Sequence, residues 1–385
     1  MTASRLAPFG TSIFAEMTAL AQSCGAVNLA QGFPDFEGPA EIVEAAVAAL
    51  RSGENQYARS RGRPELARAI ARRRERDHGR PVDPDAGVLV TCGATEAIAC
   101  AFLGCFEPGD EVLVLEPFYD SYPAAAAMAG VKLVPVTLRW PDFALDAAEL
   151  RAALGPRTRG ILLNAPHNPP GRVVSPDELE AIAALARDHD LVAITDEVYE
   201  HIWFESPPRS LASLPGMGER TLAISSAGKT FSFTGWKVGW AVGPPALVAA
   251  AAAAHQFLTF STPAPLQLAI ADALDRLDES FYLTLREDYR RRRDRMCDIL
   301  AARGFAPARP EGSYFVLAAF DGLFDGDDRA FARHLTTHAG VAAIPPTPFY
   351  SARPEEGARL LRFAFCKRDE TLEEAARRLG AGGTR

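Results

Sequence analysis

Lysine is scarce in this 385-residue sequence: only four of its 41 basic residues are lysine, at positions 132, 229, 237 and 367. A surface cation in this chain is therefore nearly always a guanidinium group. Lys229 and Lys237 lie close together in a segment of small and apolar residues. An amine can lose its proton and condense with an aldehyde, whereas a guanidinium group cannot. Lys229 is thus a candidate for covalent chemistry, although an ordinary loop lysine would also fit this segment.

Long apolar runs are also missing. The N-terminal residues contain no apolar run of signal-peptide length, and the alanine-rich run from Ala246 to His255 is too short to span a bilayer. We therefore expect a soluble cytoplasmic protein without a membrane partner. The six cysteines include no C-x-x-C pair and mostly lie in apolar segments, which predicts buried thiols in a reducing compartment.

Signatures of nucleotide and metal binding are absent as well. The sequence has no internal repeat, no Walker loop and no G-x-G-x-x-G fingerprint. His334 and His338 have the spacing of a metal-binding pair, but no third ligand is nearby, so we favour an exposed helix face and expect no metal. The net charge of −8 argues against a nucleic-acid partner. The basic run from Arg290 to Arg295 is interrupted and flanked by acidic residues, which favours a solvated helix face.

Short apolar segments alternate with helical patterns through the middle of the chain. This alternation indicates an α/β fold with a mostly parallel sheet covered by helices on both faces. Because 385 residues exceed what one hydrophobic core accommodates, we expect two domains. A long helix at 281–303, followed by antiparallel strands at 313–318 and 359–365, predicts a smaller second domain. The seven strands of the large sheet are predicted near residues 88–91, 111–115, 132–137, 160–164, 191–195, 222–225 and 238–242.

Polar residues follow several of these predicted strands. The strand at 88–91 leads through a small-residue turn at Ala94 and Thr95 into a helix, and a helix N-terminus of this kind binds anions. Thr95 would also serve as a helix cap without any ligand. Ligands bind at the carboxyl ends of strands in open α/β sheets, so the side chains placed there form one candidate site. These side chains are Tyr119, Asn168, Asp196, Tyr199, Ser226 and Lys229.

Two further positions are candidates for substrate contacts. Arg362 lies in an apolar strand, where a cation needs an anionic partner unless it reaches solvent at a sheet edge. Gly32 precedes Phe33 and Pro34 in a rigid turn with one bare backbone position, which a substrate would approach closely. The same turn would also form without a ligand.

Together these groups match the needs of pyridoxal phosphate. The aldehyde requires a lysine, the ring nitrogen a carboxylate, the 3-oxygen hydrogen-bond donors, the ring a stacking partner and the phosphate an anion site. Lys229, Asp196, Tyr199, Asn168 and Tyr119 provide the first four requirements. The anion site comes from Ala94, Thr95, Ser226 and Lys237.

Over nearly its whole length the chain resembles a fold-type I, class I/II aminotransferase of the kynurenine, glutamine and methionine branch. The resemblance begins at residues 28–36 and ends at 361–367. Five motifs occur in the family order: Gly93-Ala-Thr-Glu-Ala, Glu116-Pro-Phe-Tyr, Asn164-x-Pro-x-Asn-Pro-x-Gly, Asp196-Glu-Val-Tyr and the lysine segment 226–240.

The resemblance implies a role for each of these residues. Lys229 bonds to the aldehyde and later shuttles the substrate α-proton, Asp196 keeps the ring nitrogen protonated, Tyr199 and Asn168 bond the 3-oxygen, and Tyr119 stacks on the ring. Ser226, Lys237 and the Ala94–Thr95 turn hold the phosphate. Tyr57 reaches the phosphate of a partner subunit, which implies a homodimer with shared active sites. Arg362 clamps the substrate α-carboxylate, helped by Asn168 and Gly32.

The resemblance also implies boundaries between domains. Residues 1–44 form an N-terminal segment that joins the smaller domain, 45–283 the large coenzyme domain, and 284–385 the C-terminal part of the smaller α+β domain. Three positions depart from the family pattern: Phe14, where relatives often carry Trp, Ser261, where they often carry His, and Pro170, where many carry Thr.

The expected reaction is ping-pong transamination from an L-amino acid to a 2-oxo acid. Phe14, Tyr119 and Phe260 suggest an apolar or aromatic wall, so the expected donors are glutamine, methionine, aromatic amino acids and kynurenine. Two alternatives stay open. One is β-elimination from cysteine S-conjugates by the same residues. The other is a non-catalytic coenzyme-sensing module, which is disfavoured because such regulators carry an extra N-terminal DNA-binding domain.

Overall fold

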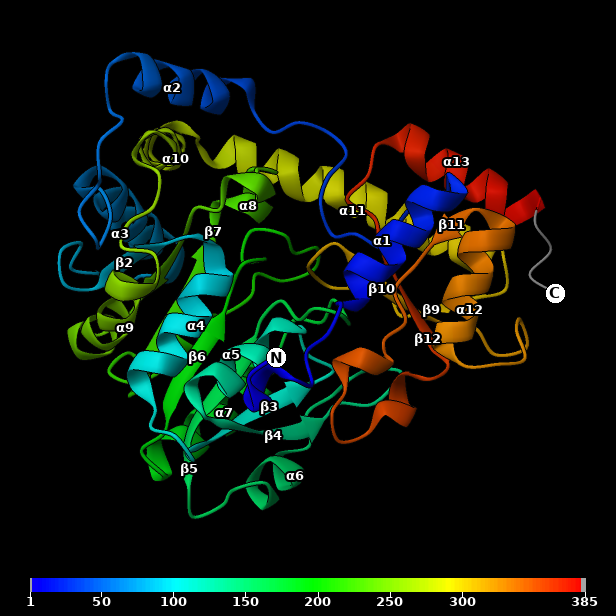
Figure 1. Cartoon of the computed structure of the whole chain (residues 1–385), viewed down its shortest axis with the longest axis horizontal. Coiled ribbons are helices and arrows are strands. Elements are labelled where there is room, and N and C mark those ends of the chain that lie inside the picture. The colour runs from blue at the N-terminus through cyan, green and yellow to red at the C-terminus, as the bar shows by residue number, and fades with distance from the viewer. Residues whose placement is uncertain (1, 382–385) are drawn as a thin grey trace.

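A seven-stranded sheet forms the centre of the computed structural model, which describes residues 2–381 (Figure 1). The strand order is β2-β8-β7-β6-β5-β3-β4, and every neighbouring pair is parallel except those made by β8. This arrangement confirms the expected mostly parallel α/β sheet. Its strands are β2 (Val88–Thr91), β3 (Glu111–Glu116), β4 (Lys132–Thr137), β5 (Thr158–Asn164), β6 (Val192–Asp196), β7 (Thr221–Ser226) and β8 (Gly239–Val242).

Helices cover both faces of this sheet because its strands are apolar on both sides. Successive side chains point to opposite faces, so Val112 and Leu113 of β3 belong to different core clusters. On the Val112 face lie α4 (Gly93–Cys105), α5 (Ser121–Ala129) and α9 (Pro245–Leu258). On the other face lie α7 (Pro176–Asp188), α3 (Pro64–His78) and α10 (Ala264–Arg276), with α2 (Ala40–Arg51) packed on α10 and α6 (Ala147–Ala152) beside α7.

The alanine-rich segment forms α9, whose small side chains let it pack closely against α4. A Cβ atom added at Gly104 of α4 would lie 2.2 Å from the Ala250 carbonyl oxygen, so the two helices are in direct contact. Among the described residues, none of the helices combines the length and the hydropathy needed to cross a bilayer.

A second, smaller group of elements follows α11 (Glu279–Ala301), the long helix that runs from the large sheet toward the C-terminal strands in Figure 1. β9 (Ala306–Pro307), β10 (Phe315–Ala319) and β12 (Leu360–Ala364) form an antiparallel sheet in the order β12-β10-β9, which confirms the two predicted strands. α12 (Asp328–His334) and α13 (Asp369–Ala381) pack beside them.

Segments from the N-terminal and C-terminal parts of the chain meet in this smaller group, although Ser4–Leu6 pack on α5 of the large sheet. β1 (Val27–Asn28) pairs in parallel with β11 (Val341–Ala342), and α1 (Ile13–Cys24) packs nearby. This pairing joins residues 27–28 to the C-terminal part, while the division into 1–44, 45–283 and 284–385 stays a prediction.

The two histidines with metal-pair spacing stack on each other. The ring centroids of His334 and His338 are 4.4 Å apart, and the rings are nearly parallel. His334 ends α12 and is partly buried. His338 lies in the π-helical turn Leu335–Ala339 and is exposed.

Candidate active site

A cavity of about 410 Å³, here called the central cavity, opens at the carboxyl ends of β5, β6 and β7. It is the position at which open α/β sheets bind ligands. The structure brings most of the predicted site residues to its wall. They are Phe14, Gly32, Ala94, Thr95, Tyr119, Asn168, Asp196, Tyr199, Ser226, Lys229, Lys237 and Arg362.

Lys229 lies in α8 (Ala227–Thr230), a single helical turn that begins directly after β7. Its Nζ atom is 5.7 Å from the ring centroids of both Tyr199 and Tyr314. The surrounding protein removes water from the charged amine, and this desolvation lowers the pKa of Lys229 to about 8. Part of the amine population is therefore unprotonated at neutral pH, which is the state that attacks a carbonyl carbon.

Asp196 is the last residue of β6, and both its carboxylate and its backbone carbonyl accept hydrogen bonds. Its carboxylate accepts a bond of 2.6 Å from the Tyr122 hydroxyl and one of 3.3 Å from the Val198 N–H. Its backbone carbonyl accepts a third bond, 2.8 Å long, from the Asn164 amide. Burial raises the pKa of Asp196, and the bond from Tyr122 acts in the opposite direction. A cation placed against this carboxylate would stabilise its ionised form.

The predicted anion site lies where α4 begins. Gly93 has a φ of +76°, and a Cβ atom there would lie 2.9 Å from the Lys237 Nζ atom. Glycine is therefore needed for the amine to approach the helix N-terminus. Ala94 and Thr95 follow in the first turn of α4, and Ser226 lies on the same cavity wall. Free N–H groups, a hydroxyl and an ammonium group thus surround one position.

Arg362 in β12 is buried, with only 1% of its surface exposed. Its guanidinium group donates hydrogen bonds of 3.0 Å to the Asn168 side-chain oxygen and to the Ala30 carbonyl, and it lies 4.0 Å from the Phe315 ring centroid. No carboxylate pairs with it among residues 2–381, and its Nε atom has no hydrogen-bond partner there. Burial lowers the pKa of Arg362 to about 10. The side chain remains a cation on the cavity wall, and its Nε donor is buried and unused.

Aromatic rings line the cavity beside this arginine. The ring centroids of Phe14 and Tyr119 are 6.3 Å apart, and Phe14 also lies 5.7 Å from Phe349. Gly32 packs closely on this region, since a Cβ atom there would lie 2.4 Å from the Phe315 ring.

Two predicted site residues do not reach the central cavity of their own chain. Tyr57 and Phe260 are 85% and 45% exposed, and their rings meet edge to face at 5.4 Å. Tyr57 lines a separate surface depression together with Ser261. For Phe260, a contact with substrate in its own chain is therefore not supported by its position.

Three supporting residues were given no role from the sequence. Tyr122 bonds Asp196, Asn164 bonds both the Asp196 carbonyl and the Asn168 N–H, and Tyr314 donates a 2.6 Å bond to the Gly32 carbonyl. The spacing from Tyr119 to Tyr122, and from Asn164 to Asn168, is close to one helical turn. These spacings were the sign in the sequence that Tyr122 and Asn164 lie near the site. Only the fold shows which atoms form the hydrogen bonds.

The side chains of the central cavity fit pyridoxal phosphate. An amine with a lowered pKa faces the same space as a buried carboxylate, and a helix N-terminus with an adjacent lysine supplies an anion site. The guanidinium group of Arg362 lies on the same cavity wall, and no carboxylate among residues 2–381 pairs with it. The set combines covalent capture of an aldehyde with binding of two anions.

Comparisons with known proteins agree with this fit. The family model described as "Aminotransferase class I and II" matches residues 25–379. A probable N-succinyldiaminopimelate aminotransferase, DapC, of Mycobacterium tuberculosis is 50% identical over 98% of both chains, and a methionine aminotransferase of Escherichia coli is 41% identical over 98% of this chain and 97% of the relative. The solved structure of N-succinyldiaminopimelate aminotransferase from Mycobacterium tuberculosis superposes with a TM-score of 0.96 at 50% identity, covering 99% of this chain and 100% of that chain. The chain therefore belongs to the class I and II aminotransferases, a family of enzymes that use pyridoxal phosphate.

Proposed function

We propose that Lys229 is the amine that bonds to the coenzyme aldehyde and then moves the proton at the α-carbon of the substrate. The observation that carries this assignment is the amine of Lys229, with its pKa lowered to about 8, in the same cavity as the buried carboxylate of Asp196. When bound, pyridoxal phosphate supplies the aldehyde that takes up the amino group and a ring that withdraws electrons from the α-carbon.

The remaining residues bind the coenzyme and position it beside Lys229. Asp196 keeps the proton on the ring nitrogen, Tyr199 and Asn168 bind the 3-oxygen, and Tyr119 stacks on the ring. Thr95, Ser226, Lys237 and the Ala94 N–H bind the phosphate, because the helix dipole and the ammonium group both favour negative charge there.

Arg362 binds the substrate α-carboxylate at the cavity wall, with Asn168 and Gly32 beside it. A guanidinium group pairs with a carboxylate through two parallel bonds, which fixes the orientation of the α-carbon beside Lys229. The wall of Phe14 and Tyr119 then accommodates the substrate side chain.

The substrate class in this proposal is an L-amino acid with a long side chain. Within the described residues, Arg362 is the one arginine that lines the central cavity, which supports uncharged donors such as methionine, glutamine, aromatic amino acids and kynurenine over aspartate. N-succinyldiaminopimelate is a second candidate, because the similarity to the relative named for that substrate reaches 50% over 98% of both chains.

The proposal also includes a cytoplasmic homodimer with shared active sites. Tyr57 and Phe260 are exposed and in contact, and Phe257 and Leu258 near Phe260 in the sequence are exposed as well, which is typical of a surface that a second copy covers. The six cysteines are free thiols, which is typical of a reducing compartment.

Two measurements test the proposal. The purified protein should become yellow with pyridoxal phosphate, and Lys229→Ala should lose the absorbance band of the covalent adduct, whereas Lys132→Ala, on the surface, should keep it. A wild-type protein that stays colourless, or a Lys229→Ala variant that keeps the band, would contradict the assignment.

A donor panel then identifies the substrate. Methionine, glutamine, phenylalanine, kynurenine, aspartate and N-succinyldiaminopimelate are compared by kcat/KM with a fixed 2-oxo acid. Release of pyruvate and ammonia from a cysteine S-conjugate without an oxo acid would instead favour the β-lyase reaction. Coenzyme binding without turnover of any donor would favour a sensing module.

A further inference from the structure

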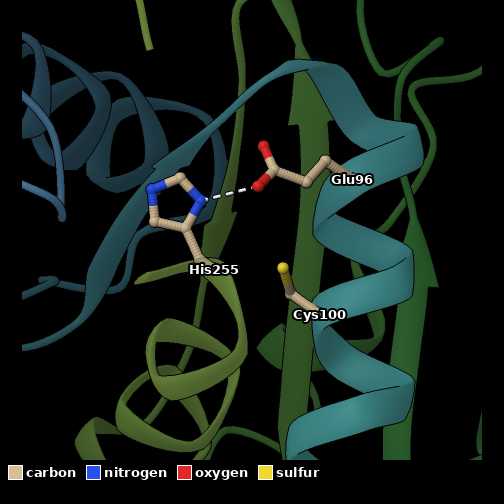
Figure 2. Close-up of side chains that lie close together, drawn as sticks. All are labelled: Glu96, Cys100 and His255. Carbon is tan, nitrogen blue, oxygen red and sulfur yellow. Dashed lines mark hydrogen bonds and ion pairs between the residues drawn. The ribbon is translucent and has the colours of Figure 1, made fainter. Parts of the chain in front are cut away.

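A buried ion pair lies directly behind the proposed phosphate site. Glu96 stands in the first turn of α4, and its Oε1 atom is 2.7 Å from Nδ1 of His255 in the last turn of α9 (Figure 2). His255 is fully buried, and the Glu96 side chain is 11% exposed. The Glu96 carboxylate also accepts hydrogen bonds from the Cys92 N–H and the Thr259 hydroxyl.

The hydrogen bonds of His255 indicate its charge. Its Nε2 atom is 2.8 Å from the Ser60 carbonyl oxygen, which can only accept a hydrogen bond. Burial acts to raise the pKa of Glu96, but the bonds from His255, Thr259 and Cys92 lower it overall, so this carboxylate also accepts. A neutral imidazole donates from one nitrogen only. Acceptors face both nitrogens of His255, an arrangement in which only the imidazolium ion donates to both.

The position of this pair matters for anion binding. A carboxylate in the first turn of α4 repels a phosphate bound at the same helix N-terminus, and the adjacent imidazolium cancels that charge. Through Ser60, His255 also ties α4 to the loop that carries Tyr57.

The other ionisable groups near the pair are Cys92 and Cys100, with Lys237 on the far side of Gly93. Arg59 and Arg61, which flank Ser60, turn toward Asp85.

A metal site is the weaker interpretation of the same cluster. Glu96, His255 and Cys100 lie close enough to share an ion (Figure 2). However, both nitrogens of His255 and the Glu96 carboxylate are already used in hydrogen bonds. Burial raises the pKa of Cys100 to about 12, which keeps its sulfur protonated, whereas metals bind the thiolate.

We propose that His255 and Glu96 act as positioning residues for the coenzyme phosphate, with the imidazolium ion of His255 neutralising Glu96 at the N-terminus of α4. This inference rests on the proposed placement of the phosphate beside Thr95 and Lys237. Neither side chain lines the central cavity, so the pair acts through the helix terminus and its charge.

The experiment compares two aldehydes that differ only in the phosphate. Dissociation constants of pyridoxal phosphate and pyridoxal are measured by absorbance titration of the full-length protein freed of coenzyme. His255→Gln leaves Glu96 uncompensated, so the dissociation constant of pyridoxal phosphate should rise about tenfold while that of pyridoxal changes little. Glu96→Gln removes the carboxylate that repels the phosphate, so it should not raise either constant by more than about threefold.

The double variant Glu96→Gln with His255→Gln provides the rescue test. It lacks both charges of the pair, so it should lose much less affinity for pyridoxal phosphate than His255→Gln does, although it too lacks His255. His255→Asn serves as a second neutral variant if His255→Gln does not fold. Glu178→Gln is the matched control, because Glu178 also caps a helix N-terminus, that of α7, but lies away from the cavity.

Lys237→Gln separates this inference from the proposed phosphate site. If Lys237→Gln binds pyridoxal phosphate as tightly as the wild type, the phosphate placement is wrong and the inference falls with it. If Lys237→Gln weakens only pyridoxal phosphate but His255→Gln weakens both aldehydes equally, or neither, the pair has only a structural role. A Glu96→Gln variant that loses as much affinity as His255→Gln would overturn the charge argument.

Discussion

The hydroxyl group of Tyr122 donates a 2.6 Å hydrogen bond to the carboxylate of Asp196, at the end of β6. The Tyr122 ring also contacts the Tyr119 ring edge to face, with centroids 5.8 Å apart. One short segment after β3 thus supplies both the proposed stacking ring and the donor that favours the ionised form of Asp196.

Tyr122→Phe should lower kcat about tenfold, because a hydrogen bond to a buried charged group is lost. The ionised form of Asp196 loses a donor, so its pKa rises further and the acid limb of the kcat profile moves to higher pH. Steady-state kinetics from pH 5 to 9 measure both effects. Tyr282→Phe is the control, since the Tyr282 hydroxyl has no hydrogen-bond partner among residues 2–381. An unchanged acid limb in Tyr122→Phe would contradict the role of this bond.

Lys229→Met should stabilise the coenzyme-free protein in a pH-dependent way. The pKa of Lys229 falls from 10.5 to about 8 on folding, so below pH 8 the folded wild type buries a charged amine that the variant lacks. The variant should therefore be more stable by about 3 kcal/mol near pH 7.

Between pH 8 and 10.5 the unfolded wild type binds more protons than the folded protein, so its free energy of unfolding rises relative to that of the variant. Denaturant unfolding of both proteins at pH 7, 8, 9 and 10 measures this difference. If the difference in free energy of unfolding between Lys229→Met and the wild type stays constant over this range, the pKa of Lys229 is not lowered.

Arg362→Ala should bind pyridoxal phosphate normally but lose at least about a hundredfold in kcat/KM for α-amino acids, because the carboxylate loses its two-point partner. Absorbance titration measures the first property and coupled kinetics the second. Arg359→Ala is a matched control that lies just before β12, where Arg359 pairs with Asp321 outside the central cavity. Normal turnover by Arg362→Ala would contradict the assignment of the α-carboxylate site.

Tyr57→Ala and Lys229→Ala should complement each other if the active sites are shared. Each variant alone has low activity, since one lacks the proposed contact to the partner's phosphate and the other lacks the amine. In a mixed dimer, one site combines Lys229 of one chain with Tyr57 of the other, so activity should return to about a quarter of the wild-type value when the two chains assort randomly. Mixing after mild denaturation and refolding tests this. Activity that does not recover in verified mixed dimers would place Tyr57 outside the site.

Much of the fold and most of the site could be predicted from the sequence. The apolar strands and the helix signals predicted the seven-stranded sheet, because burial on both faces demands continuous apolar residues. The scarcity of lysine indicated Lys229 as a candidate for covalent chemistry, and the five motifs indicated the residues around it. The strand ends then placed Asp196 and Ser226 at one edge of the sheet, as the structure has them.

Other contacts could not be predicted because they join residues that are far apart in the sequence. His255 and Glu96 stand 159 positions apart, and nothing local to either residue indicates the other. Phe260 was likewise expected at the substrate wall, but only the structure places it outside the cavity of its own chain, against Tyr57.

The sequence by itself determined which chemical groups are available and that parallel strands deliver most of them to one edge, because strand direction and apolar pattern are local properties. Only the tertiary structure decided what each group touches. Arg362 became an unpaired cation, and Lys229 an amine of lowered pKa, through burial among residues from distant parts of the chain. Burial and charge balance depend on the whole packed molecule, so no single segment encodes them.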